Sequence, residues 1–253
     1  MKYSVIIPAY DEEQNVPLVA EQVSAALDAL GAEGEIIFID DGSTDGTYRA
    51  MAARRAKDRR VKIIRFRRNF GQSLAWQAGF DHACGEIVIT MDADLQNDAR
   101  DIPAMVRKLE EDNYDVISGW RSERKDARHL MLLSAVGNWL RRVMTGDTIH
   151  DQGCSLKVYR RECLAGVDVC RDLHRRYITA ILQGKGCRVG EMKIRHHRRK
   201  HGRSKYTIRK KWKGIPDLLV LAFWRQHSTR RVQTTNKAYA IERLDGFGED
   251  MPS

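Results

Sequence analysis

Apolar residues in the first half of the chain follow two alternating spacings. Residues 4–7, 35–39 and 61–66 are short, largely apolar runs bounded by polar or turn residues, which is typical of buried strands. Residues 16–30 instead carry an apolar side chain every three or four positions, which predicts a helix. The same reasoning predicts strands at 86–91 and 116–117, and helices at 45–57, 73–83 and 102–111. Strands that alternate with helices predict an α/β fold, with a mostly parallel sheet flanked by helices.

Beyond Arg121 the pattern is less regular. Helices are expected over 130–144 and 177–183, and extended segments over 155–159 and 189–194. Residues 207–224 mix cationic and apolar side chains, with Pro216 near the middle, so either an interfacial helix or an ordinary core helix fits them. We therefore expect one domain at 1–206, an amphipathic, membrane-proximal helical segment at 207–228, and a polar, disordered tail at 229–253.

The positive charge is concentrated in one segment. The chain has 253 residues and a net charge of +10, and residues 188–213 contain twelve Lys or Arg and one acidic residue, Glu191. This basic segment (residues 188–213) has a net charge of +11, so the rest of the chain is close to neutral. It favours binding to phosphates of a nucleotide, an anionic membrane or a nucleic acid. The alternative is a solvated charged face.

The cysteines and the hydropathy pattern indicate a cytoplasmic protein. The five cysteines include no C-x-x-C pair and are expected to be reduced thiols. Cys154 and Cys163 are expected to be small buried residues rather than nucleophiles. No apolar run approaches the roughly 20 residues that span a bilayer.

Carboxylates follow three of the predicted strands. They are Asp11, Glu12 and Glu13, then Asp40 and Asp41, then Asp92 and Asp94. Because parallel strands end at the same edge of a sheet, where open α/β folds bind ligands, we expect these side chains to converge. There they can accept hydrogen bonds from a base or a ribose and can bind metal. Turn chemistry is the alternative for Asp41.

The stretch from Asp92 to Gln96 carries the most specific chemistry. An extended backbone would point Asp92, Asp94 and Gln96 to the same side. Three oxygen donors suit a hard cation such as Mg²⁺ or Mn²⁺, which in turn suits a diphosphate. A polar turn after a strand is the alternative. The glycine patterns of a Rossmann dinucleotide site and of a P-loop are both absent from the sequence.

Several motifs in the same order resemble those of a known enzyme family. The stretches SVIIPAYDEE (4–13), IDDGSTD (39–45) and RNFGQ (68–72) resemble family 2 glycosyltransferases of the GT-A fold. The stretches DADLQN (92–97), DQGC (151–154) and HRRKHGRSKY (197–206) resemble more narrowly the polyprenyl-phosphate glycosyltransferases, which include dolichol-phosphate mannosyltransferase and bacterial undecaprenyl-phosphate sugar transferases. The resemblance covers about residues 2 to 228.

This resemblance implies a role for particular residues. Pro8, Tyr10, Glu12, Asp41 and Asp92 would bind the nucleotide sugar. Asp92, Asp94 and Gln96 would hold the metal and the diphosphate, and Arg121 would complete a catalytic set with the two aspartates near the acceptor phosphate. Arg198, Ser204 and Lys205 would close over the phosphates.

The implied reaction transfers a sugar from a UDP- or GDP-linked donor to a polyprenyl phosphate, with Mg²⁺ or Mn²⁺ as cofactor. A lipid phosphate is already ionised at neutral pH, so we expect a single displacement with inversion and no strong general base. Many bacterial relatives carry two transmembrane helices where this chain has a polar tail. We therefore expect a peripheral protein at the inner face of the membrane, held by an anionic lipid surface and in some cases by an anchoring partner protein. An altered gene is the other explanation.

Two other functions remain open from the sequence. A soluble family 2 transferase acting on a saccharide hydroxyl would need a catalytic carboxylate near the sugar. A nucleic-acid-binding protein would use the basic segment with steep salt dependence, but it leaves the stretch from Asp92 to Gln96 unexplained.

Overall fold

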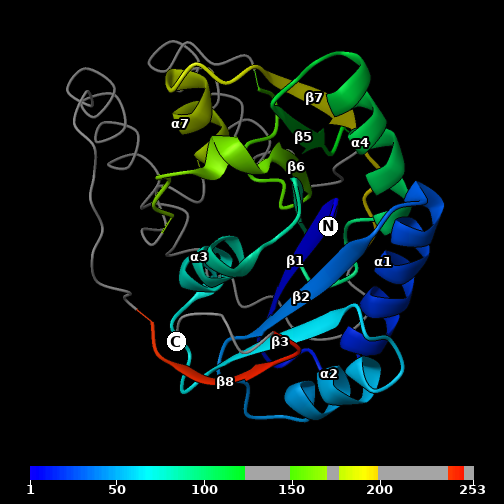
Figure 1. Cartoon of the computed structure of the whole chain (residues 1–253), viewed down its shortest axis with the longest axis vertical. Helices are drawn as coiled ribbons and strands as arrows, with labels where there is room; N and C mark the ends of the chain where they lie inside the picture. The colour runs from blue at the N-terminus through cyan, green and yellow to red at the C-terminus, as the bar shows by residue number, and fades with distance from the viewer. Residues whose placement is uncertain (123–148, 170–176, 199–238, 248–253) are drawn as a thin grey trace.

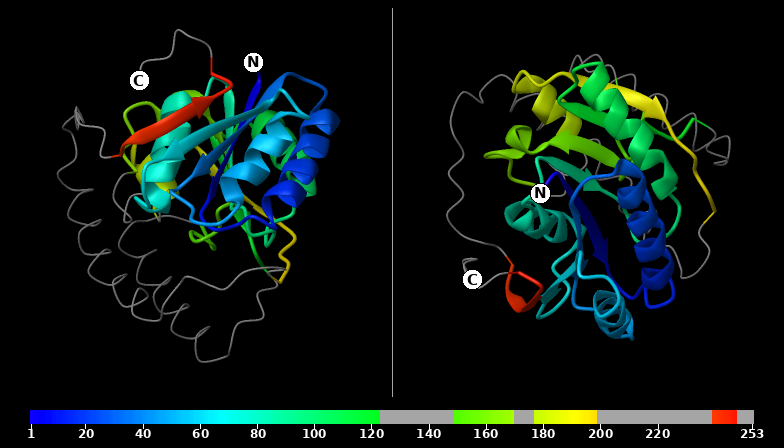
Figure 2. Two further views of the ribbon diagram at one scale, coloured as in Figure 1. Left: turned by 90° about the horizontal axis from the view of Figure 1, so that it is seen from below. Right: turned by 45° about the vertical axis from the view of Figure 1, so that its right-hand side comes forward.

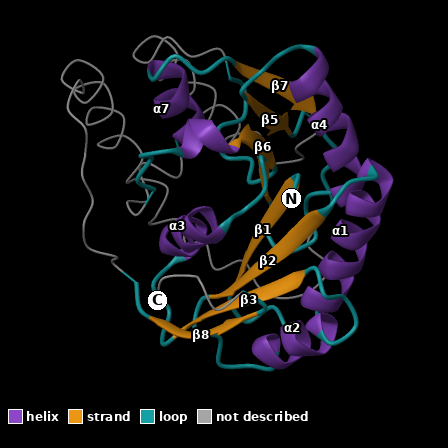
Figure 3. Ribbon diagram, in the orientation of Figure 1, coloured by secondary structure: helices purple, strands orange, loops and turns teal. Residues whose placement is uncertain are grey.

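In the part of the chain that the structure describes, the strands form one eight-stranded sheet (Figures 1 and 3). The computed structural model describes residues 1–122, 149–169, 177–198 and 239–247. The strand order is β7-β5-β6-β4-β1-β2-β3-β8. The helices expected at 130–144 and 207–224 lie outside the described residues.

The strands combine a parallel centre with antiparallel additions. Their bounds are β1 Tyr3–Ala9, β2 Gly34–Asp40, β3 Val61–Phe66, β4 Ile87–Thr90, β5 Val116–Trp120, β6 Lys157–Arg160, β7 Val189–Lys193 and β8 Ile241–Asp245. Strand β1 pairs in parallel with β2 and β4, β2 with β3, and β5 with β7. Strand β6 lies antiparallel between β4 and β5, and β8 lies antiparallel beside β3. The expected α/β fold is therefore confirmed, with two antiparallel strands that the β-α alternation did not indicate.

Helices cover both faces of the sheet (Figures 1 and 2). The described helices are α1 Val16–Leu30, α2 Thr47–Arg55, α3 Gln72–His82, α4 Ile102–Glu111 and α7 Ile178–Gly184, with short 3-10 turns at Ala99–Asp101 and Arg161–Leu164. One face packs against α1, α2 and α4, and the other against α3 and α7. The expected helices at 16–30, 45–57, 73–83, 102–111 and 177–183 are all present with modest shifts of their ends.

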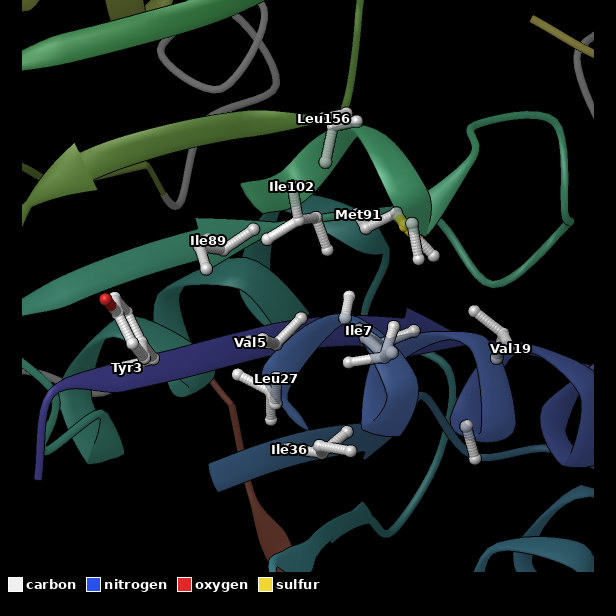
Figure 4. Packing of buried hydrophobic residues seen from close by; sticks show 14 of the residues in the cluster. Tyr3, Val5, Ile7, Val19, Leu27, Ile36, Ile89, Met91, Ile102 and Leu156 are labelled. Carbon is white, nitrogen blue, oxygen red and sulfur yellow. The ribbon is translucent and has the colours of Figure 1, made fainter. Parts of the chain in front are cut away.

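Two hydrophobic clusters, one on each face of the sheet, explain why apolar and polar residues do not alternate along the central strands. Val5 and Ile7 pack in the cluster under α1, whereas Ile6 packs in the cluster under α3. Figure 4 shows Val5 and Ile7 beside Val19 and Leu27 of α1. Because both faces of β1 are buried, every position of the strand is apolar or enclosed.

Part of the tail expected to be disordered is instead a strand. Residues Ile241–Asp245 form β8 against β3. Tyr239 stacks on Phe66 at 5.2 Å between ring centroids and donates a hydrogen bond to Asp81 at 2.7 Å. The expectation failed here because these long-range contacts offset the polar composition of an edge strand. Residues 229–238 and 248–253 lie outside the described residues.

Within the described ranges, no helix combines the length and apolar character needed to cross a lipid bilayer.

Candidate active site

The acidic strand ends do converge at one edge of the sheet. Strands β1 and β2 end side by side, with Ala9 paired to Asp40, and the Asp41 backbone N–H donates to the carbonyl of Ala9 at 2.9 Å. Strand β4 joins the other side of β1, and the Met91 N–H donates to the carbonyl of Ile6 at 3.1 Å. Parallel pairing therefore places the loops after β1, β2 and β4 along one edge, as the sequence predicts.

The loop after β4 bends sharply rather than continuing as an extended strand. Leu95 has a φ of +60°, which is rare for a leucine. The N–H of Gln96 turns back to donate to Asp94 Oδ1 at 3.1 Å. Asp94 is buried, whereas Asp92 is partly buried and accepts a hydrogen bond from Gln72 of α3. The expectation of an extended stretch that aligns three side chains was wrong, because a turn closes around Asp94.

Asp41 holds together the loops that follow β2 and β3. Its carboxylate accepts backbone N–H bonds from Phe70 at 2.7 Å and from Gly71 at 2.9 Å. Burial raises the pKa of Asp41 to about 6, although the two N–H bonds act in the opposite direction. Asp41 is therefore a structural acceptor in this protein as well as a candidate nucleotide ligand.

A close approach between these loops requires a glycine at position 42. Gly42 has a φ of +68°, and a Cβ there would lie 2.3 Å from the backbone carbon of Arg68. Only glycine permits both the left-handed backbone and this contact.

The loop after β1 is fixed to the loop after β2. Asp11 donates its N–H to Ser43 Oγ at 3.0 Å, and its carboxylate accepts the N–H of Thr44 at 2.9 Å. Glu12 donates its N–H to Thr47 Oγ1 at 2.7 Å, and its carboxylate accepts from Asn15. Tyr10 and Glu12 are partly buried and Pro8 is buried in β1, so these three and Asp41 belong to adjoining strand ends.

Arg121 follows β5 and is engaged by an aspartate that received no role from the sequence. Its Nε donates to Asp151 Oδ2 at 2.6 Å and its second terminal nitrogen to Asp151 Oδ1 at 2.9 Å. Burial alone would lower the pKa of Arg121, but this bidentate pair raises it above its ordinary value, and the charge of Asp92 acts in the same direction. Arg121 is thus a cation held in a fixed position, and its charge interacts favourably with that of Asp92.

A second layer of side chains holds the Arg121–Asp151 pair. Glu191 of β7 accepts the backbone N–H of His150 at 2.8 Å and that of Asp151 at 3.0 Å. Lys157 is buried and donates its ammonium to the carbonyls of Gln152 and Cys154. These contacts fix the DQGC turn, which is the one signal in the sequence that pointed to Asp151.

The start of the basic segment is joined to the loop that carries Asp94. The His197 N–H donates to the carbonyl of Gln96 at 2.8 Å, and its Nε2 lies 3.1 Å from Asp98 Oδ2. Arg195 forms an ion pair with Asp101 at 2.8 Å. Hydrogen bonds from Arg100 and then His197 hold the pKa of Asp98 well below its usual range. Arg198, which is exposed, follows directly, whereas Ser204 and Lys205 lie outside the described residues.

The oxygen ligands at this edge of the sheet fit a hard divalent cation. Asp92 and Asp94 supply carboxylate oxygens, and Mg²⁺ is commonly held by one or two carboxylates together with substrate phosphates. Within the described ranges, the single cluster of three His, Cys, Asp or Glu ligand atoms lies elsewhere, around Asp115. A cation at this edge would therefore take further oxygens from a diphosphate.

Comparison with known sequences gives a consistent result. Residues 4–167 match the family model described as glycosyl transferase family 2. The chain is also 41% identical over 236 residues to the dodecaprenyl-phosphate galacturonate synthase of Rhizobium johnstonii. That alignment covers 91% of this chain and 69% of the relative.

Solved structures share the fold at low sequence identity. The glucosyl-3-phosphoglycerate synthase of Mycobacterium tuberculosis, in complex with Mn²⁺, UDP-glucose and phosphoglyceric acid, superposes with a TM-score of 0.61 at 18% identity, covering 88% of this chain and 80% of the other. The mannosyl-3-phosphoglycerate synthase of Rubrobacter xylanophilus superposes with a TM-score of 0.65 at 14% identity, covering 92% and 76%.

Proposed function

The chain belongs to glycosyl transferase family 2, and we propose that it transfers a sugar from a nucleoside diphosphate to a polyprenyl phosphate. The observation that carries the choice of acceptor is its 41% identity, over 91% of the chain, to a dodecaprenyl-phosphate galacturonate synthase. The structural neighbours with phosphoglycerate acceptors share less than 20% identity and support only the fold.

The donor would lie across the strand ends at the edge of the sheet. Pro8, Tyr10, Glu12 and Asp41 belong to the loops where a base and a ribose would lie. Asp92 and Asp94 would hold Mg²⁺ or Mn²⁺ against the diphosphate, with Gln96 fixing Asp94 through its backbone N–H. The metal would neutralise negative charge that develops on the leaving diphosphate.

Arg121 would stabilise charge on the acceptor side of the reaction. Its guanidinium is fixed by Asp151 and lies within electrostatic range of Asp92, so a phosphate beside it would approach the sugar from a preorganised position. An ionised lipid phosphate attacks carbon 1 of the sugar, and the bond from that carbon to the diphosphate breaks. One displacement of this kind inverts the anomeric configuration and requires no general base.

The basic segment would complete the site at the membrane surface. His197 is bonded to Gln96 and Asp98, which places the first part of this segment beside the loop that carries Asp94. Arg198, Ser204 and Lys205 would then contact the phosphates. The segment's charge would hold the protein at the anionic inner face of the membrane, with or without an anchoring partner.

Calorimetric titration of the purified protein with UDP- and GDP-sugars, with and without Mn²⁺, tests the donor half of this proposal. We expect one nucleotide class to bind only in the presence of the metal. Equal binding without metal would contradict the role of Asp92 and Asp94. The absence of binding to either nucleotide class would contradict the transferase assignment itself.

A further inference from the structure

Three side chains of types that can bind a metal meet at the edge of the sheet opposite the candidate active site. Asp115 precedes β5, Cys163 lies in the 3-10 turn after β6, and Cys187 precedes β7. The two sulfur atoms and a carboxylate oxygen all lie within 4.8 Å of one another. Arg121 follows the other end of β5, and a five-residue strand spans about 17 Å. The cluster is therefore separate from the proposed donor site.

Backbone contacts hold Asp115 beside Cys187. The N–H of Arg188, the residue after Cys187, donates to Asp115 Oδ2 at 2.7 Å. The N–H of Asp115 in turn donates to the carbonyl of Arg188 at 2.9 Å, and the N–H of Arg160 donates to the carbonyl of Asp115 at 2.9 Å. The Asp115 carboxylate is thus held by the backbone N–H of Arg188, and the Nε of Arg160 lies 3.9 Å from its other oxygen, Oδ1.

The two thiols are free and adjacent. Cys163 and Cys187 are both half-buried, and neither belongs to a disulfide. Burial raises the pKa of both thiols, and the contact between them raises that of Cys163 further, to about 12. The two sulfur atoms are therefore close enough to bind one ion together.

We propose that Asp115, Cys163 and Cys187 form a zinc site. Two thiolates and one carboxylate are ligands that select Zn²⁺ over the hard cations Mg²⁺ and Mn²⁺. Zn–S bonds of about 2.3 Å and Zn–O bonds of about 2.1 Å would place these three ligand atoms roughly 3.6–3.8 Å apart in a tetrahedral site, within the 4.8 Å spread of this cluster. A water molecule takes the fourth position.

Binding at this site releases protons and joins three strands. Each thiol gives one proton to solvent as its sulfur forms a bond to zinc, and the carboxylate binds already ionised, so two protons leave per ion. Affinity therefore rises with pH. The ion would tie together the segments that begin β5 and β7 and that follow β6, which stabilises the part of the sheet farthest from β8. This function is independent of sugar transfer.

Cobalt titration of the full-length protein in a phosphine reductant tests the site. Cobalt(II) replaces zinc and gives a near-ultraviolet charge-transfer absorption only when thiolates are its ligands. We expect the wild-type protein to bind one Co²⁺ with this absorption, zinc to displace it, and excess Mg²⁺ to leave it unchanged. Zinc added to the wild-type protein should also raise its thermal midpoint.

Cysteine variants supply the controls. Cys163→Ser and Cys187→Ser should each weaken the absorption and lower metal affinity at least about 10-fold, with an unchanged circular dichroism spectrum. Cys84→Ser, which removes an exposed free cysteine outside the cluster, should bind as the wild type does. Absence of the absorption in the reduced wild-type protein would overturn the proposal, whatever the variants do. Its persistence in both cluster variants, or a Cys163–Cys187 disulfide in rapidly alkylated protein, would also overturn it.

Discussion

Asp94 is the residue on which the proposed chemistry most depends. It is buried, and the N–H of Gln96 orients it within a loop bent at Leu95. A left-handed leucine costs energy that the surrounding structure must offset, and such outliers cluster at functional sites. The bend and the burial together indicate a carboxylate held in a set position.

Replacing Asp94 by asparagine should abolish metal-dependent transfer. We expect kcat/KM to fall at least about 100-fold, because one charge that holds the cation and the diphosphate is removed. Asp112→Asn, at an exposed salt bridge to Lys108, is the matched control and should keep full activity. Steady-state assays of both variants, with circular dichroism to verify folding, make the comparison. Wild-type activity in Asp94→Asn would disprove the metal assignment.

Asp41 should give the protein's stability a distinctive pH dependence. Its pKa is raised to about 6, so the folded state holds this proton more tightly than the unfolded state does. The stability associated with the protonated form is present below about pH 4 and is lost as pH rises through 6. The free energy of unfolding of the wild type, relative to Asp41→Asn, should therefore fall by about 1–3 kcal/mol between pH 4 and pH 7.

Urea denaturation of the wild type and of Asp41→Asn at several pH values measures this difference. If the difference between the two proteins is the same at every pH, the pKa of Asp41 is not raised.

The sequence predicted the candidate ligand residues better than it predicted the contacts that hold these residues in place. Asp92 and Asp94 follow a recognisable strand, so their place at the sheet edge could be predicted. Their alignment with Gln96 could not, because only tertiary packing forces Leu95 into a left-handed conformation. Asp151 and Glu191 were also missed as a support for Arg121, since they lie 30 and 70 positions away from it in the sequence.

At the scale of elements, the part of the basic segment that follows β7 is bonded to the loop after β4. His197 lies 46% exposed, so its bond to Asp98 is partly screened. We expect His197→Ala to reduce kcat/KM about 5-fold, the equivalent of about 1 kcal/mol. The exposed Arg107→Ala on α4 should have no effect.

The variant His197→Gln tests whether the hydrogen bond to Asp98 causes this effect. An amide can restore the hydrogen bond, so we expect it to recover part of the loss. Equal activities for His197→Ala and the wild type would show that the contact has no role in turnover.

Strand β8 is an element that the sequence did not predict. Its pattern, IERLD, is short and mostly charged, and the β-α alternation gives no reason to expect another strand. Only the structure shows that it covers the exposed edge of β3, an edge that proteins commonly protect. The regular strands and helices of the first half were predictable because their apolar spacing repeats locally.

The anchor of β8 can be tested through Tyr239. Tyr239→Phe removes the hydrogen bond to Asp81 and should lower the free energy of unfolding by about 1 kcal/mol. Tyr239→Ala also removes the stacking on Phe66 and should cost about 3–5 kcal/mol. Chemical denaturation measures both. Unchanged stability in the alanine variant would show that β8 is not anchored in this way.

At the scale of the whole molecule, the two opposite edges of the sheet carry different sets of reactive side chains. Hard carboxylates and cations gather where β1, β2, β4 and β5 end, whereas the thiol pair lies where β5 and β7 begin. The fold and the family are shown by the comparisons, but neither specifies the acceptor. The central claim is therefore the transfer of a sugar to a lipid phosphate.

Mass spectrometry of the lipid extract tests that claim most directly. The purified protein would be incubated with Mn²⁺, UDP- and GDP-sugars, and polyprenyl phosphate in detergent, with phosphoglycerate and a free saccharide as parallel acceptors. We predict one new lipid, heavier than the polyprenyl phosphate by one sugar residue, and no such product with Asp94→Asn. If the sugar instead appears on the saccharide or the phosphoglycerate while the lipid stays unmodified, the proposed acceptor is wrong.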